Sequence, residues 1–545
     1  MISPKNRLLI ILITLFSVNS AFSQALERPR LVVGIVVDQM RWDYLYRFYD
    51  RYGAHGFRRM LNEGLSCQNA MINYLPSYTA VGHATVYTGS VPSLHGIAAN
   101  NFYRNSTGES IYCTQDNSVR GVGCPDPNAT QGRMSPKNLQ VTTITDELKL
   151  ATNFRSKVVG IAIKDRGSIL PAGHAADAAY WFDYKSGNWI TSTWYRESLP
   201  KWLENYNEKK SWKKYIEKDW TTLYPIETYI QSTPDRNNYE EQFVENQGVE
   251  FPIKSAELSK TQGEGFMICQ TPYGNAMTLD VAQLAVENEQ LGADKITDFL
   301  TVSFSSPDYI GHRFGANSAK VEDNYLRLDH DLGEFLKFLD AKIGRDNYLV
   351  FLTSDHAGAH NGQFLLDNKI AAGNWEQDIY ADSLNSYLAK KFDAEKIVRN
   401  LDNYQINFDI RKIDSLKLDF EKIREESVKY MSQFSVFQYV VDLTKISEAV
   451  VPAKLREMII NGYNREFSGA VQLVLKAGFY SDSDLRGATH GSWNPYDTHI
   501  PLLFFGWGIN KATTTAEVHM TDIAATIAAM LHIQMPSACI GKPVF

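Results

Sequence analysis

The sequence predicts an α/β fold in which a mostly parallel central sheet is flanked by helices. Apolar runs of five to seven residues, without polar alternation, occupy 31–37, 158–163, 299–304, 348–352 and 501–505. Such runs, rich in Val, Ile and Phe, are typical of strands buried on both faces of a parallel sheet. Helical apolar spacing occurs in 278–289 and 323–339. The chain is 44% hydrophobic and 21% charged, which is ordinary for a globular protein.

Each of these expected strands lies beside a side chain that binds metals or phosphates. The residues are Asp38, Lys164 with Arg166, Asp308 with His312, Asp355 with His356, and His490 shortly before the last strand. Open α/β sheets bind ligands outside the carboxyl ends of their strands. One Asp after a strand is common in a short polar loop, but so many together indicate a single site assembled from the whole chain.

We expect residues 1–23 to be a secretory signal peptide. Lys5 and Arg7 form a basic start, an apolar core covers 8–18, and Ala21 to Ser23 supply the small residues of a cleavage site. The apolar core is too short to span a bilayer, and no later run is long enough. The sequence therefore predicts an exported protein, periplasmic or secreted, that does not insert into a membrane after cleavage.

The mature chain, residues 24–545, is expected to form one domain with two cap insertions. The first insertion, at about 181–265, contains Trp181, Trp189, Trp194, Trp202, Trp212 and Trp220. The second, at about 365–480, is polar and helical, with one expected strand at 434–441. The formal charge is −7 and no basic run occurs, so we expect no specific nucleic-acid partner. We expect a monomer.

Five cysteines are spread along the chain. In an oxidising compartment at least one disulfide is expected, and Cys113 with Cys124, which bracket a polar loop, is the favoured pair. The odd number leaves at least one thiol free or bonded between chains. The absence of a CxxC motif makes the cysteines poor candidates for zinc ligands.

Three carboxylates and three imidazoles make up the expected metal ligands. They are Asp38, Asp308, His312, Asp355, His356 and His490. Oxygen and nitrogen donors without thiolate favour zinc over manganese or iron. Six protein ligands are too many for one tetrahedral ion, so they predict two ions that each keep a position open for substrate.

A hydroxyl nucleophile is expected near the start of a helix that follows residue 75. Thr79 lies near the first turn, where free backbone N–H groups stabilise an alkoxide and an incoming phosphoryl group. The alternative role for Thr79 is an ordinary helix N-cap. Ser77 is the rival hydroxyl, and the chemistry of the residues alone does not rank the two.

Several motifs resemble those of the alkaline phosphatase superfamily, in particular its phosphodiesterase and PafA-type phosphatase branches. The matching residues are Thr79, Thr88, Gly89, Pro92, His95, Gly96, Ile97, Asn100, Ser354, Asp355, His356, Thr489, His490, Gly491, Thr521 to Thr526, Pro536, Gly541, Lys542 and Pro543. The resemblance implies an alkaline-phosphatase-like fold over the mature chain outside the insertions. It also implies two Zn²⁺ ions and makes Thr79, rather than Ser77, the nucleophile.

The same resemblance divides the ligands between the two ions. One zinc is expected on Asp38, Thr79, Asp355 and His356, and the other on Asp308, His312 and His490. Asn100 is expected to hydrogen-bond a phosphoryl oxygen. Sulfatase chemistry is disfavoured, because the Thr79 segment lacks the Cys/Ser-x-Pro-x-Arg signature.

Lys164 and Arg166 distinguish the two branches. A monoester dianion leaves three phosphoryl oxygens whose charge must be met in the transition state, whereas a diester leaves one fewer. PafA-type phosphatases resemble this chain in carrying such a Lys-x-Arg pair; the alternative is two solvated surface cations. We therefore expect an exported two-zinc alkaline phosphatase that hydrolyses small phosphate monoesters through a phosphothreonine. The runner-up is a phosphodiesterase or nucleotide pyrophosphatase, and sulfatase is the third alternative. An alternative of a different class is an exported metal-binding or adhesion protein that has lost activity.

Overall fold

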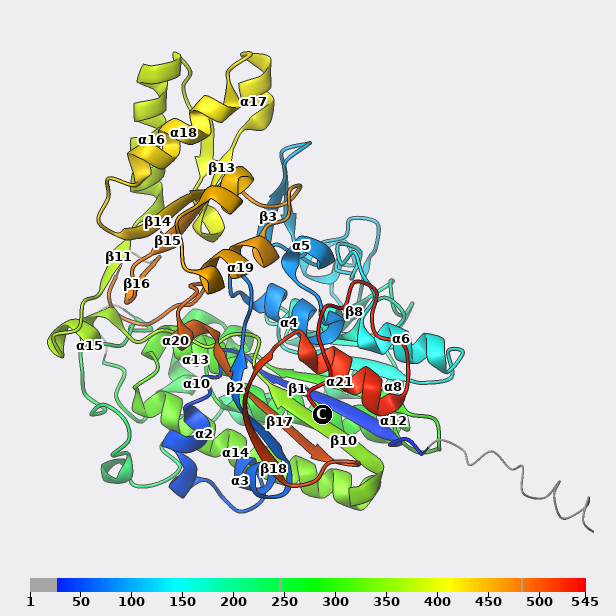
Figure 1. Cartoon of the computed structure of the whole chain (residues 1–545). Coiled ribbons are helices and arrows are strands. Elements are labelled where there is room, and N and C mark those ends of the chain that lie inside the picture. Colours follow the sequence, from blue (N-terminus) through cyan, green and yellow to red (C-terminus); the bar gives the residue numbers. More distant parts are fainter. Residues whose placement is uncertain (1–26, 245–247, 482–483) are drawn as a thin grey trace, which may run out of the picture.

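The computed structural model describes residues 27–244, 248–481 and 484–545, and the expected signal peptide lies outside them. A ten-stranded sheet forms the centre, in the order β18-β2-β17-β10-β1-β9-β6-β7-β8-β5 (Figure 1). Its strands are β1 Leu31–Val37, β2 Leu65–Met71, β5 Gly121–Val122, β6 Val158–Ala162, β7 Ala178–Asp183, β8 Asn188–Ser192, β9 Asp298–Phe304, β10 Tyr348–Thr353, β17 His499–Gly506 and β18 Ala512–His519. The five expected strands are therefore all present in this sheet.

The sheet is mixed. β1 pairs in parallel with β9 and β10, and β6 pairs in parallel with β9 and β7. β17 runs antiparallel between β10 and β2, so the parallel direction expected for the run at 501–505 is wrong. An apolar run reports burial on both faces but not direction, which depends on the connections on either side.

Helices cover both faces of the sheet, and alternate residues of β1 show the two cores. Val33 and Ile35 pack in the core that includes residues of α12 and α14, whereas Val32 and Val36 pack in the core that includes α4 and α21. The main helices are α3 Phe57–Glu63, α4 Thr79–Thr88, α6 Ile144–Ala151, α7 Asp165–Ala172, α8 Lys201–Glu208, α12 Tyr273–Asn288, α13 Ser306–Phe314, α14 Ala319–Lys342 and α21 Asp522–Leu531. Side chains on successive strand residues point to opposite faces, so uninterrupted apolar sequence is what such a strand requires.

The first expected insertion begins too early. β7 and β8 form an antiparallel pair within the central sheet, so residues up to Ser192 belong to the core. Trp181 and Trp189 are buried there, at 2% and 0% exposed. Aromatic residues are favoured in strands. The first tryptophans of this segment therefore belong to a strand pair of the central sheet and not to an insertion.

The second expected insertion contains a separate four-stranded sheet with its own core (Figure 1). The strands are β12 Val398–Asn400, β13 Gln405–Phe408, β14 Phe437–Asp442 and β15 Val471–Leu475, and the larger helices are α16 Gln377–Phe392, α18 Phe420–Met431 and α19 Ala453–Gly462. The strand expected at 434–441 corresponds to β14. We call residues 373–481 the small-sheet region.

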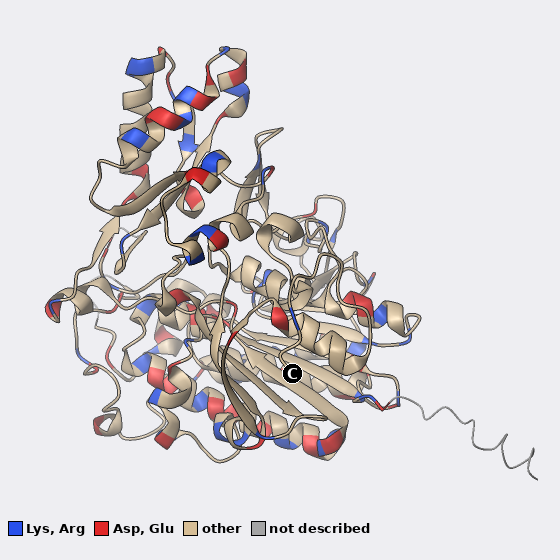
Figure 2. Ribbon diagram, in the orientation of Figure 1, with Lys and Arg blue, Asp and Glu red and all other residues tan. Residues whose placement is uncertain are grey.

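Charged residues lie mainly on the helices and loops, and the central strands are largely apolar (Figure 2). Within the described ranges, none of the helices has the length and apolar character needed to cross a bilayer. All five cysteines are free in the described structure, so the expected Cys113–Cys124 disulfide is wrong. Burial raises the pKa of the Cys113 thiol to about 12, which keeps it protonated and unreactive.

Candidate active site

The expected metal ligands converge on one edge of the central sheet. Asp38 directly follows β1, Asp308 lies in the first turn of α13 after β9, and Asp355 comes two residues after β10. His490 precedes β17 in the chain. Because β17 runs antiparallel to β10, its amino end lies at the edge where β10 has its carboxyl end. The antiparallel direction therefore explains how a residue before a strand joins residues that follow strands.

The three histidines are held in the same way. Nδ1 of His356, His312 and His490 lies 2.9, 2.8 and 2.7 Å from the carbonyl oxygens of Ala357, Ala488 and Ser77, respectively. A carbonyl only accepts, so each Nδ1 donates and each Nε2 is left for another partner. Fixing the tautomer through the second ring nitrogen is characteristic of metal-ligating histidines.

The Nε2 atoms face the carboxylates. His356 Nε2 lies 3.4 Å from Asp38 Oδ1, and His312 Nε2 lies 3.2 Å from Asp308 Oδ1. His490 Nε2 is 3.8 Å from the same Asp308 oxygen. The rings of His356 and His490 stack with centroids 3.5 Å apart, so the two groups of ligands are in direct contact.

Two buried carboxylate oxygens of the site lack hydrogen-bond partners among the described residues. Asp38 and Asp355 are fully buried and Asp308 is 4% exposed. Among the described residues, Asp38 Oδ1 and Asp355 Oδ2 are buried without a hydrogen-bond partner. Buried carboxylates are costly unless they are paired or bind metal ions. The orphaned oxygens and the nitrogen-oxygen donor set fit divalent cations such as zinc.

Burial and close neighbouring charges shift the pKa values of the carboxylates and histidines in the site. Burial and the neighbouring charges of Asp308 and Asp355 raise the pKa of Asp38 well above its usual value. Burial acts in the same direction on Asp308, but the charges of His312 and Lys164 hold its pKa well below the usual range. Burial lowers the pKa of His490, and the charges of His356 and His312 lower it further, so its Nε2 carries a lone pair. Strongly shifted groups are typical of functional sites.

Two sets of three residues bring their ligand atoms within 4.8 Å of one another. One set is Asp308, His312 and His490, the grouping that the resemblance implied. The other is Asp38, Asp308 and His356; it includes Asp308 and leaves out Asp355, whose Oδ2 lies 3.6 Å from His356 Nε2. Asp308 therefore lies between the two sets and is placed to contribute to both.

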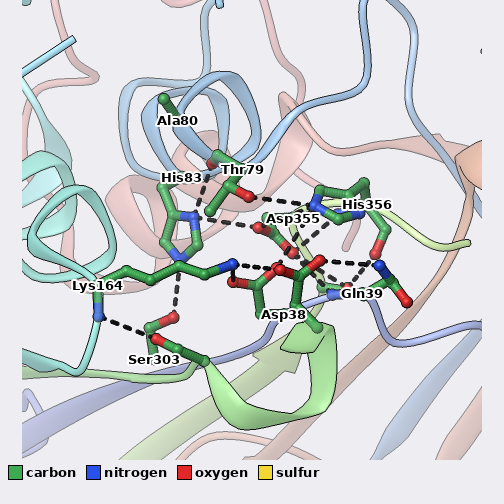
Figure 3. A network of polar contacts seen from close by, with 12 residues as sticks. Asp38, Gln39, Thr79, Ala80, His83, Lys164, Ser303, Asp355 and His356 are labelled. Carbon is green, nitrogen blue, oxygen red and sulfur yellow. Dashed lines mark hydrogen bonds and ion pairs between the residues drawn. The ribbon is translucent and has the colours of Figure 1, made fainter. Parts of the chain in front are cut away.

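Thr79 is the first residue of α4, and its hydroxyl points towards His356 (Figure 3). Its Oγ1 lies 3.4 Å from His356 Nε2. The cap position belongs to Tyr78, so the alternative reading of Thr79 as the N-cap is wrong. The rival hydroxyl is engaged elsewhere, since Ser77 Oγ donates to the carbonyl of Ser492 at 3.1 Å.

Asn100 is held at the start of the same helix. Its Oδ1 accepts a hydrogen bond from the backbone N–H of Ala80 at 2.9 Å, which satisfies one of the unpaired donors of the first turn. With the oxygen engaged, the amide nitrogen of Asn100 is the group that remains to donate. An amide donor held at the first turn of α4 suits an anionic oxygen.

Lys164 and Arg166 follow β6 at the start of α7. Lys164 Nζ lies 2.6 Å from Asp38 Oδ2 and 2.5 Å from Asp308 Oδ2, within the ligand cluster (Figure 3). Arg166 Nη1 donates to the hydroxyl of Tyr112 at 3.1 Å, and Arg166 Nε is buried without a partner among the described residues. Lys164 therefore lies within the ligand cluster, and Arg166, which contacts Tyr112 and has a buried Nε, is not a fully solvated surface charge.

Sequence reasoning missed two polar residues here, Gln39 and Tyr112. Gln39 donates from Nε2 to Asp308 Oδ1 at 2.8 Å and from its backbone N–H to Asp355 Oδ1 at 3.2 Å. Tyr112 donates to Asp165 at 2.7 Å as well as accepting from Arg166. Nothing in the sequence distinguishes Gln39 or Tyr112 from ordinary loop and strand residues. The adjacency of Gln39 to Asp38 was the one available signal.

His83 holds the start of α4 and the neighbouring carboxylate Asp355 in place (Figure 3). Its Nδ1 lies 2.8 Å from the Thr79 carbonyl oxygen and 3.4 Å from Asp355 Oδ2. Its Nε2 lies 2.8 Å from Ser303 Oγ, on β9. His83 thus joins the start of α4 to β9 and to Asp355, which follows β10.

Comparison with known proteins agrees with this geometry. Residues 32–497 match the family of type I phosphodiesterases and nucleotide pyrophosphatases. A protein from Myroides odoratus named calcium-transporting ATPase is 51% identical over 97% of this chain and 96% of its own length. Alkaline phosphatase PafA of Elizabethkingia meningoseptica is 44% identical over 100% of this chain and 99% of its own. Alkaline phosphatase PhoV of Synechococcus elongatus is 46% identical over 96% and 94%.

The fold also matches solved structures. The crystal structure of wild-type PafA superposes with a TM-score of 0.92, at 45% identity, over 96% of this chain and 99% of that one. A second PafA structure, with a TM-score of 0.92 and 44% identity, carries substitutions of a threonine, an asparagine, a lysine and an arginine. The central sheet with flanking helices is therefore the fold of that phosphatase.

Proposed function

Because this chain belongs to the type I phosphodiesterase and nucleotide pyrophosphatase family of the alkaline phosphatase superfamily, we propose that it is an alkaline phosphatase that hydrolyses phosphate monoesters through a phosphothreonine on Thr79. One observation carries the proposal: the Thr79 hydroxyl, two sets of metal-binding side chains and the Lys164–Arg166 pair occupy one sheet edge. Each of these elements alone has a structural explanation. Together they are what metal-assisted phosphoryl transfer requires.

Two zinc ions suit the site best. One would be held by Asp308, His312 and His490, and the other by Asp38, Thr79, Asp355 and His356, with the bridging position of Asp308 open to both. When bound, such ions would polarise the phosphoryl group and lower the pKa of a hydroxyl or of water. The protein residues fix the donors: Gln39 and His83 hold Asp308, Asp355 and the backbone of Thr79 in place.

Thr79 Oγ attacks phosphorus, the alcohol leaves from the opposite side, and a phosphothreonine forms. Water then attacks the same phosphorus, the bond to Thr79 breaks, and inorganic phosphate is released. Two in-line displacements give net retention at phosphorus. The start of α4 favours the negative charge that develops on the phosphoryl oxygens, because its free N–H groups and dipole point towards them.

Lys164 and Arg166 support the choice of monoesters over diesters. Asn100, Lys164 and Arg166 are positioned for the phosphoryl oxygens, and a monoester dianion offers them three oxygens free of substituents. The lysine, arginine, asparagine and threonine altered in the PafA variant are the residue types found here at Lys164, Arg166, Asn100 and Thr79. Arg166 has a buried Nε without a partner among the residues that the structure describes, as expected of a group that binds an anion.

The name of the Myroides odoratus relative refers to an ATPase. ATP, like a monoester, ends in a phosphoryl group with three unesterified oxygens, so terminal phosphate release from ATP is compatible with the proposed site. We take no transport function from that name. Export by a cleaved signal peptide, a monomeric state and the absence of a nucleic-acid partner remain predictions from the sequence.

The proposal is tested with purified, zinc-supplemented protein on p-nitrophenyl phosphate and bis-p-nitrophenyl phosphate. We expect a higher kcat/KM for the monoester by several orders of magnitude. Faster turnover of the diester would favour a phosphodiesterase of the same family. Hydrolysis of neither compound would reject both enzymes and favour the binding-protein alternative.

A further inference from the structure

A cavity opens beside the cationic pair. Its volume is about 290 Å³, and it is lined by Lys164 and Arg166 at one side and by aromatic rings, including Tyr112, Tyr184 and Tyr309. A volume near 300 Å³ is at the small end of ligand pockets, which are mostly apolar with a few placed polar groups. The cavity is therefore suited to a ligand with one ring.

Two of the lining tyrosines, Tyr184 and Tyr309, pack against the same phenylalanine. Phe266, on α11 Glu264–Cys269, lies edge-to-face against both Tyr184 and Tyr309, with centroids 5.8 and 6.2 Å apart. Tyr309 is adjacent in sequence to the metal ligand Asp308, and Tyr184 comes from the turn between β7 and β8. Tyr184 is 43% exposed, so one of the lining rings remains available at the mouth.

The cavity adjoins the two cations that the proposed mechanism assigns to the phosphoryl oxygens. A monoester held by Lys164 and Arg166 therefore has space beside these cations for its alcohol portion. The cavity is continuous with these two cations, and Lys164 Nζ lies 5.1 Å from the centre of the Tyr309 ring. A ring placed there gains edge-to-face or offset contacts with tyrosine.

We propose that this cavity binds the alcohol portion of the substrate and selects phosphate monoesters that carry a single flat aromatic ring near the phosphate. The inference rests on the proposed monoesterase activity and names its substrate class. Tyr184 is the residue through which the preference is to be tested, because its exposure makes substitution tolerable.

The experiment compares benzyl phosphate with cyclohexylmethyl phosphate, which have similar size, the same charge and similar leaving groups. We expect kcat/KM to favour the benzyl ester by about tenfold, mostly through KM, since ring contacts act on bound substrate and transition state alike. Tyr184→Phe should keep the preference and Tyr184→Ala should reduce it to about twofold. Tyr224→Ala, at an equally exposed tyrosine outside the cavity, should leave it unchanged.

The proposal is overturned if the wild-type protein does not prefer the benzyl ester. It is also overturned if the preference is the same in wild type and in Tyr184→Ala. If neither ester is hydrolysed, the proposed function is wrong. The ligand preference of the cavity is then tested by measuring binding. Benzylphosphonate should then bind zinc-loaded protein more tightly than cyclohexylmethylphosphonate in calorimetry, and equal Kd values overturn the inference.

Discussion

The hydroxyl oxygen of Thr79 lies 3.4 Å from Nε2 of His356. Thr79 is 1% exposed and His356 is fully buried, so this hydroxyl has little access to bulk water. The contact places a potential nucleophile against a metal-binding histidine at the first turn of a helix. This position fits the chemical role that we propose for Thr79, and we expect its loss to affect the reaction more than the fold.

Replacing the nucleophile should separate activity from stability. We expect Thr79→Ala to lower kcat/KM for p-nitrophenyl phosphate by at least about 10³-fold, whereas Thr79→Ser keeps a hydroxyl and stays within roughly tenfold of wild type. Metal content and melting temperature of both variants are the controls. Ser77→Ala, which removes the rival hydroxyl, should retain most activity. Full activity in metal-loaded Thr79→Ala would refute the mechanism.

Loss of the guanidinium should penalise monoesters selectively. Arg166→Ala removes a charged donor from the phosphoryl oxygens, and we expect monoester kcat/KM to fall by about 10²–10³-fold. The diester rate should fall much less, so the ratio of the two rates is the measurement. Arg166→Lys should recover only part of the loss, because an ammonium lacks the planar fork of a guanidinium. An equal fall for both ester types would indicate a general structural effect.

Gly82 sets the distance between the nucleophile helix and the strand-end carboxylate. A Cβ atom at this position would lie 2.2 Å from the carbonyl oxygen of Asp355, and backbone atoms cannot move aside cheaply. We expect Gly82→Ala to destabilise the protein by about 1–3 kcal/mol and to lower activity strongly by shifting Thr79. Gly333→Ala is the control in another helix, where the nearest atom, Cβ of His55, is 3.1 Å away. That variant should keep normal activity.

The sequence was sufficient to locate the site because its residues sit at strand ends, and buried strands are visible as apolar runs. β1 and β10 were predicted within one residue of their observed ends, and Asp38, Asp355 and His356 follow from them. Strand direction was not predictable, as β17 demonstrates. Its antiparallel course depends on contacts with β2, hundreds of residues away in sequence.

The unforeseen parts of the site depend on long-range geometry. Gln39 reaches Asp308 across 269 residues, and Tyr112 meets Arg166 across 54. No local pattern encodes such pairs. The prediction of a Cys113–Cys124 disulfide was wrong for a related reason. Two cysteines that are close along a loop need not bring their side chains together in the geometry that a disulfide requires.

A histidine away from the site should make stability depend on pH. His174 Nδ1 lies 3.0 Å from Asp146 Oδ2, and its Nε2 lies 3.0 Å from the carbonyl oxygen of Leu139. Burial acts to lower the pKa of His174, but the hydrogen bond and charge of Asp146 raise it above its usual value. Protonated His174 therefore stabilises the fold below a pH of about 6.5, and this contribution is lost as the pH rises through the folded-state value.

The corresponding variant is His174→Gln. We expect it to lower the free energy of unfolding by about 0.5–1 kcal/mol at pH 5.5, with a smaller difference at pH 9, measured by urea denaturation. The same comparison, with and without His174→Gln, can be repeated in protein that carries Asp146→Asn. There, the difference in the free energy of unfolding should no longer depend on pH. A difference that grows with pH would contradict the assigned ion pair.

Removal of divalent cations should lower both activity and stability, and restoring zinc should recover both. Asp38, Asp308 and Asp355 bring three buried carboxylates together, and Lys164 is the cation in direct contact with two of them. Cations that bind only the folded state stabilise it by about 2.7 kcal/mol at a hundredfold excess over Kd. We therefore expect a chelator to lower the melting temperature and abolish turnover.

Asp308→Asn alters the residue shared by both ligand sets, and it should reduce bound zinc. Asp43→Asn is the control, because Asp43 is held by Arg41 outside both sets, and it should reduce bound zinc less. Melting curves and metal analysis of the two variants measure this, and a chelator-insensitive melting temperature in active wild-type protein would rule the metal site out.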